Sequence, residues 1–191
     1  QVKLELEAEG NLERFSGTQT RVGLLDGTVT ASGPVGWWPR IGWDLDIRAQ
    51  DIKPGLLLEQ PADWPGSLTL HATTAGALDS TGPAGHAALD SLGGTLRKQP
   101  LRGHLRLSFA DSVYRVEALA LGWGSAQLTA SGTVADTLSV RYRVNVANLA
   151  TAVPGAGGSL AAAGTAEGPR SAARIRLELK GNRLVYGTNR L

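Results

Sequence analysis

The sequence contains no cysteine and no methionine, and aromatic residues make up only 5% of its 191 positions. Without cysteine, the chain can form neither a disulfide framework nor a thiolate metal site. Its 19 basic and 17 acidic residues nearly cancel, for a net charge of +2. A nucleic-acid-binding domain would show a concentrated basic patch instead, so no nucleic-acid partner is expected. No apolar run approaches the roughly 20 residues of a membrane-spanning helix.

The chain is rich in glycine, with 25 residues spread along its length. Glycine at this density marks the ends of many short elements rather than one linker. Turn signals such as Asp26-Gly27, Gly33-Pro34 and Gly93-Gly94 separate these elements. The length favours a single domain.

Apolar and polar residues alternate with a period of two over much of the chain. The clearest runs cover residues 2–8, 41–49, 68–73, 101–109, 138–146 and 174–180, and weaker ones cover 27–33, 126–132 and 159–164. Successive side chains of a strand point to opposite faces, so each run predicts a strand with one apolar and one solvated face. About a dozen strands at such spacing are typical of a sandwich, a barrel or a β-solenoid.

Helix is predicted in two places at most. Residues 111–121 could instead form a capped helix with Val113, Val116, Leu119 and Ala120 on one face. Residues 53–60, between Pro54 and Pro61, could hold one helical turn.

A short repeat indicates an elongated sheet. Thr30-Ala31-Ser32-Gly33 recurs as Thr129-Ala130-Ser131-Gly132, an interval of 99 residues that is too long for a solenoid coil. The repeat suggests a strand-rich unit duplicated along the sheet. The chain also begins within an alternating run, at Val2, which favours a segment cut from a longer protein. We therefore expect residues 1–191 to form a single elongated segment.

The motifs of common catalytic sites are incomplete. Gly157-Gly158-Ser159-Leu160-Ala161 lacks the final glycine of a nucleophile elbow. The glycine run at 155–158 lacks the residues that complete a phosphate-binding loop. His71, His86 and His104 have no second ligand at metal-binding spacing. We expect no catalytic residues, no metal and no cofactor.

Two sets of polar residues leave alternatives open. Asp44 and Asp46 project from one strand face and could imitate the carboxylate pair of a carbohydrate-processing enzyme, although a solvated face explains them as well. A set of basic residues also recurs on polar strand faces: Arg141, Arg143, Arg174, Arg176 and Lys180. They are interpreted mainly as solubilising, with contact to anionic lipid head groups as the second interpretation. The tryptophans Trp37, Trp38 and Trp43 suggest packing or a sheet edge.

The apolar side of such a sheet must be covered. Two sheets could close into a sandwich with a filled core, or one sheet could curl into an open trough. The predicted lining is mostly aliphatic with little aromatic bulk, which suits flexible acyl chains. A lining without fixed polar anchors is typical of a conduit rather than of a specific pocket.

Several stretches resemble the repeat region of the TamB family. They are residues 27–45, Trp64-Pro65-Gly66-Ser67-Leu68, the block 92–103 with its Leu96-Arg97-Lys98-Gln99-Pro100-Leu101 core, and 124–132. The similarity runs from about residue 20 to residue 180, and the block 92–103 is its most specific part.

The resemblance implies an all-β fold, an elongated and curled antiparallel or mixed sheet known as a β-taco, with a U-shaped apolar groove. It implies a periplasmic segment of a protein anchored in the inner membrane, which carries phospholipid between the two membranes and is linked to outer-membrane protein assembly. It also implies a TamA-like outer-membrane barrel as a partner, reached through other parts of the full-length chain.

Phospholipid acyl chains would then contact the apolar positions of the strands. These are Leu4, Leu6, Trp43, Leu45, Ile47, Leu68, Leu70, Leu105, Leu107, Leu119, Leu128, Val140, Tyr142, Val144, Ile175, Leu177 and Leu179. The alternative is a structural β-solenoid or sandwich segment of a surface adhesin or autotransporter passenger, with a dry, filled core.

Overall fold

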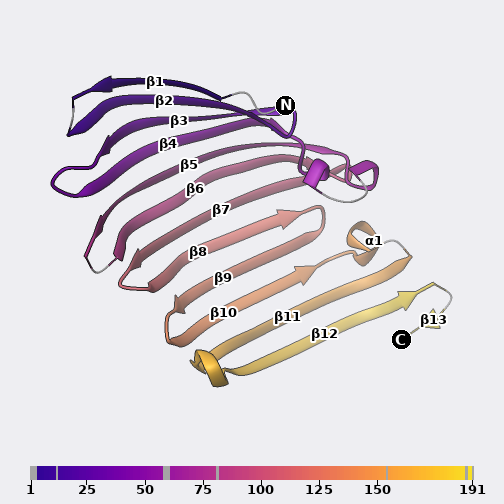
Figure 1. Cartoon of the computed structure of the whole chain (residues 1–191). Helices are drawn as coiled ribbons and strands as arrows, with labels where there is room; N and C mark the ends of the chain where they lie inside the picture. Colours follow the sequence, from indigo (N-terminus) through magenta and orange to yellow (C-terminus); the bar gives the residue numbers. More distant parts are fainter. Residues whose placement is uncertain are drawn as a thin grey trace.

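One large sheet makes up almost the whole molecule. The computed structural model describes residues 4–11, 13–57, 61–80, 82–153, 155–187 and 189–190. They form a 13-stranded sheet in which every strand pairs with the next along the chain, in the order β1 to β13. Each pairing is antiparallel, so the sheet is a continuous meander with no crossover and no parallel pair (Figure 1).

Most strands are long. Their bounds are β1 Leu4–Gly10, β2 Arg14–Leu24, β3 Gly27–Gly36, β4 Ile41–Ile52, β5 Gly66–Asp79, β6 Gly82–Leu96, β7 Gln99–Ala110, β8 Val113–Trp123, β9 Ala126–Val134, β10 Thr137–Val146, β11 Ala156–Pro169, β12 Arg174–Tyr186 and β13 Asn189–Arg190. The short helices are η1 Pro54–Leu57, η2 Pro61–Asp63, α1 Leu149–Ala152 and η3 Arg170–Ala172. The helical turn expected over residues 53–60 is therefore present as η1, and residues 58–60 lie outside the described part.

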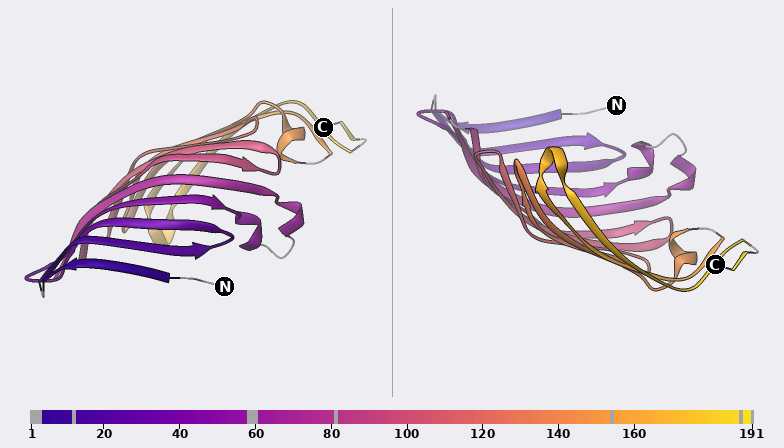
Figure 2. Two further views of the ribbon diagram at one scale, coloured as in Figure 1. Left: turned by 90° about the horizontal axis from the view of Figure 1, so that it is seen from above. Right: turned by 90° about the horizontal axis from the view of Figure 1, so that it is seen from below.

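The sheet is curled and does not close, because β1 and β13 lie at opposite ends of the strand order (Figures 1 and 2). Bulges interrupt the register of most neighbouring pairs, for example between Leu89 and Leu92 and between Val116 and Leu119. A bulge bends its strand and increases the local twist, so a series of bulges gives the sheet its curvature.

The molecule is a single layer. Contacts between elements run almost entirely between consecutive strands, and α1 lies against β11. Among the described residues, the buried hydrophobic side chains are Ala49, Leu101 and Val146. A sandwich of this size would bury many more, so the expected open, curled sheet is confirmed.

Tight hairpins connect several strands. The turn residues Arg97 and Lys98 have φ of 52° and 62°, and Asp111 and Ser112 have φ of 49° and 63°. Two consecutive positive φ values define the type I′ turn, whose twist matches that of antiparallel strands. The turn at Asp111-Ser112 leads directly into β8.

The alternative of a helix over residues 111–121 is wrong. The segment is strand β8, in which the bulge at 117–118 brings Val116 and Leu119 to the same face. That spacing of three residues imitates the period of a helix. Val113 and Ala120 lie on the other face, opposite Ala110 and His104.

Three glycines are required where neighbouring backbones approach closely. Gly33, Gly94 and Gly132 have φ of 139°, 137° and 141°, a region that side chains rarely adopt. A Cβ atom on Gly33 would lie 1.9 Å from the Asp44 carbonyl oxygen, and one on Gly132 would lie 2.1 Å from that of Ser139. The two copies of the Thr-Ala-Ser-Gly repeat thus end in the same backbone conformation, in β3 and β9.

The adjacent residues Gly93 and Gly94 allow a controlled test of this requirement. Gly94→Ala should lower the free energy of unfolding by about 1–3 kcal/mol, because it strains the backbone and places a Cβ atom 2.1 Å from the Ser67 carbonyl oxygen. Gly93→Ala meets nothing within 4 Å and should change stability by less than about 1 kcal/mol. Urea unfolding followed by circular dichroism measures both, and equal losses in the two variants would contradict this account.

Candidate functional site

The candidate site is the apolar face of the sheet. Directly opposed residues of antiparallel strands project to the same side, so the register can be followed from strand to strand. Leu45 lies opposite Thr74, Leu105 opposite Leu119, and Val144 opposite Leu128. The register places these sequence-predicted positions on one face: Trp43, Leu45, Ile47, Leu68, Leu70, Leu105, Leu107, Leu119, Leu128, Val140, Tyr142, Val144, Ile175, Leu177 and Leu179.

The remaining two predicted positions lie in β1. Leu4 pairs with Val22 and Leu6 with Thr20. Their side chains lie outside the part of the chain whose side chains the structure describes. Both residues therefore stay predicted members of the apolar face.

The bulges hid several further residues of this face from the sequence pattern. Leu89 and Leu92 of β6 both project to it, as do Leu121 and Trp123 of β8. A bulge lies between Leu89 and Leu92, and another separates Leu121 and Trp123 from Val116, so the period shifts by one residue at each place. A search for alternation that tolerates one extra residue would find them.

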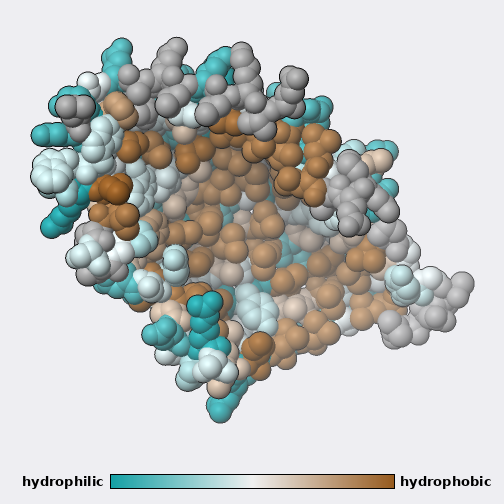
Figure 3. Space-filling model, viewed as in Figure 1, coloured by the Kyte–Doolittle hydropathy of each residue, from teal (hydrophilic) through white to brown (hydrophobic). Residues whose placement is uncertain are grey.

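The apolar face is open to solvent. Figure 3 shows it as a broad apolar hollow bordered by paler and more polar residues. In β12, the side chains of Ile175, Leu177 and Leu179 are 68%, 59% and 59% exposed. Soluble proteins rarely leave a contiguous apolar surface of this kind without a partner or ligand.

Trp43 lies along the floor of this hollow. A Cβ atom on Gly76 would lie 2.7 Å from the Trp43 ring, so the indole rests over that glycine. The indole N–H donates to Thr74 Oγ1 at 3.1 Å, and the ring stacks on Phe109 with centroids 6.4 Å apart. Trp43 is therefore packed separately from Trp37, which contacts Phe15 with centroids 4.5 Å apart.

Other large side chains are accommodated in the same way. The Tyr142 ring lies over Gly164. A Cβ atom added to Gly164 would lie 2.5 Å from the Tyr142 hydroxyl oxygen. Leu121 and Leu92 lie over Gly103 from either side. Because these side chains lie over glycines, they stay close to the sheet, and the floor of the hollow is smooth at these positions.

The opposite, polar face carries the residues considered for catalysis. Asp46 Oδ2 lies 2.6 Å from His71 Nε2, and its Oδ1 lies 2.9 Å from Arg48 Nε. The hydrogen bond with His71, with Arg48 nearby, holds the pKa of Asp46 below its usual range. A general acid for glycoside cleavage needs a raised pKa. Asp44 lies on the same face as Asp46 and is exposed.

The described residues were also compared with the requirements of a metal site and of a membrane-spanning helix. Within them, no group of three or more histidine, cysteine or acidic side chains could hold a metal ion. None of the helices found there has both the length and the apolar character needed to cross a membrane.

The sequence was compared with known families, curated proteins and solved structures. No curated protein and no solved structure matches it. The family model described as TamB, N-terminal domain, matches residues 1–191. A curled antiparallel sheet with one apolar face agrees with the family resemblance found in the sequence. The chain therefore belongs to the TamB family, within the part that the N-terminal domain model describes.

Proposed function

We propose that the apolar face shelters phospholipid acyl chains, and that the chain is one segment of a hydrophobic conduit between the inner and outer membranes. The observation that carries this proposal is the single-layer sheet, whose aliphatic face continues from β4 to β12 with no covering layer among the described residues. Membership of the TamB family supports a role in transport or assembly at the cell envelope.

Hydrocarbon is the ligand that this face suits. Its side chains are mainly leucine, valine, isoleucine and alanine, which offer dispersion contacts without fixed polar anchors. Burial is worth roughly 0.8 kcal/mol per methylene group, so a long acyl chain would gain on the order of 10 kcal/mol. Exposure of the acyl chain and of the apolar face to water is unfavourable, so the two surfaces associate.

The smooth floor favours movement over tight retention. Trp43 and Tyr142 lie flat over Gly76 and Gly164, which keeps these two rings close to the floor of the hollow. The Trp43 N–H already donates to Thr74 and is not free to anchor a ligand. An acyl chain would therefore meet a series of similar aliphatic contacts and could slide along them.

Membership of the TamB family supports a placement in the cell envelope. We propose that the segment lies in the periplasm, as part of a protein anchored in the inner membrane. A TamA-like outer-membrane barrel would be reached through other parts of the full-length protein. Membership of the TamB family also supports a link to outer-membrane protein assembly.

A charge in the hollow tests the proposed path. Val144→Asp should reduce photo-crosslinking of a phospholipid to the chain at least about tenfold, because a desolvated carboxylate costs more than the 1.4 kcal/mol that tenfold represents. Asn145→Asp places the same charge on the opposite face and should leave crosslinking unchanged. Equal crosslinking by both variants would refute the proposal.

In the full-length protein, Leu107→Asp and Leu177→Arg should block the transfer of phospholipid between membranes while the sheet stays folded. Ser108→Asp, on the polar face beside Leu107, is the matched control. Transfer of labelled lipid is the measurement, with circular dichroism to verify folding. Normal transfer in the Leu107 and Leu177 variants would exclude the conduit.

The rival function, a dry structural segment of an adhesin, makes a different prediction. Lipid extracted from the purified chain and analysed by mass spectrometry should contain phospholipid if the hollow holds acyl chains. The Val144→Asp variant should carry clearly less of it. A lipid-free wild-type chain would favour the structural role.

A further inference from the structure

The polar face of the sheet has an uneven distribution of charge. Its strands β7, β8 and β10 carry Arg102, Arg106, Arg115, Arg141 and Arg143, with Glu117 as the acidic residue among them. Over β4 to β6 the same face carries Asp44, Asp46 and Asp90 with Arg48. A net charge of +2 for the whole chain conceals this separation into an acidic half, over β4 to β6, and a basic half, over β7 to β10.

The arginines of the basic half have no ion-pair partner among the described residues. The ion pairs of arginine and lysine found there lie elsewhere, at Arg48–Asp46, Lys53–Asp26, Arg176–Glu167 and Lys180–Glu178. Within residues 82–153, all of which the structure describes, no arginine forms an ion pair. Strand β9 contributes only neutral polar side chains between β8 and β10 on this face: Gln127, Thr129, Ser131 and Thr133.

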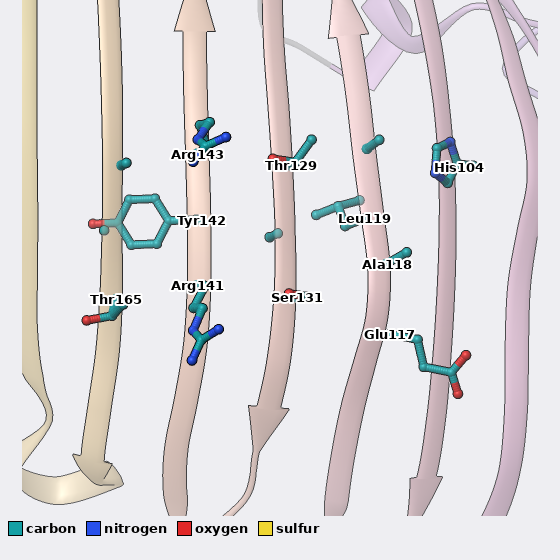
Figure 4. Close-up of a pocket in the computed structure, with 14 residues that line it drawn as sticks. His104, Glu117, Ala118, Leu119, Thr129, Ser131, Arg141, Tyr142, Arg143 and Thr165 are labelled. Atoms are coloured by element: carbon teal, nitrogen blue, oxygen red, sulfur yellow. The ribbon is translucent and has the colours of Figure 1, made fainter.

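Two of these arginines border a depression of about 640 Å³ on the polar face. Arg141 lies directly opposite Ser131 on one side and Thr165 on the other, and Arg143 lies opposite Thr129. Figure 4 shows both arginines on β10 with these hydroxyl residues on the adjacent strands. His104 and Glu117 line the side of the depression formed by β7 and β8.

We propose that this depression binds a phosphate group, held chiefly by Arg141 and Arg143. A guanidinium donates two parallel hydrogen bonds to the oxygens of a phosphate. The hydroxyls of Thr129, Ser131 and Thr165 are further donors within the same depression. Residues two apart on one strand face lie about 6.6 Å apart, a spacing from which two long side chains can converge on one anion.

The phosphate site is separate from the proposed lipid path. Arg143 and Val144 are successive residues of β10 and project to opposite faces of a single-layer sheet. A lipid with its acyl chains along Val144 cannot place its head group against Arg143 in the middle of the strand. Phosphate binding here is therefore independent of the proposed function. Free phosphate and phosphorylated lipid head groups share this chemistry.

The test compares two double variants that remove the same charge. Arg141→Gln/Arg143→Gln alters the depression, and Arg21→Gln/Arg48→Gln alters two arginines, one on β2 and one on β4, that flank Thr30 on the same face. Binding of inorganic phosphate is measured by calorimetry, and binding to vesicles of phosphatidylglycerol or of phosphatidylcholine by flotation. Circular dichroism verifies that each variant folds.

Phosphate should bind the wild type and the Arg21/Arg48 variant alike, and at least tenfold more weakly to the Arg141/Arg143 variant. If flotation with phosphatidylglycerol, but not with phosphatidylcholine, is also lost in the Arg141/Arg143 variant alone, the source is a lipid head group. If phosphate binding changes and flotation does not, the source is a soluble phosphate-bearing ligand. Absence of phosphate binding by the wild type, or equal losses in both variants, would overturn the site.

Discussion

The structure depends on backbone hydrogen bonding between consecutive strands. A globular domain buries its apolar side chains between two layers, but here a single layer leaves Ala49, Leu101 and Val146 as the buried hydrophobic side chains of the described residues. Each inner strand satisfies its N–H and C=O groups through two neighbours, and side chains on one face pack against those of the next strand. Contacts are therefore local along the sheet, as in repeat proteins.

The same ladder keeps two different surfaces apart. A slip of one residue would move the apolar side chains of a strand to the polar face. The bulges add a residue to one strand of a pair, yet the apolar positions on both sides of each bulge, such as Leu89 and Leu92, still project to the apolar face. The bulges therefore curve the sheet without mixing its faces. The curvature turns a flat apolar surface into a hollow, while the polar face keeps its separated charges.

Glycine has two distinct roles in this arrangement. At Gly33, Gly94 and Gly132 it allows a backbone conformation that other residues rarely adopt and a close approach of the neighbouring strand. At Gly76 and Gly164 it leaves room for the rings of Trp43 and Tyr142 to lie flat. The high glycine content thus reflects a thin sheet with a smooth apolar surface, in addition to the many turns.

The class of fold and most of the candidate site follow from the order of the amino acids. Alternation of period two depends only on the geometry of an extended chain, so the pattern alone assigns residues such as Leu105, Val144 and Leu177 to one face. The block from Leu92 to Gly103 also carries the resemblance to the TamB family, which the family model over residues 1–191 confirms.

The positions at which the period changes, and whether the apolar face is covered, emerge only from the folded arrangement of the strands. A bulge depends on pairing with another strand, so β6 gave no clear alternation, and Val116 and Leu119 could imitate a helix. The grouping of Arg141 and Arg143 with hydroxyls of β9 and β11 likewise requires the register between strands. Alternation is the same in a closed sandwich and in an open sheet, because it reports which face is apolar and not what lies against that face.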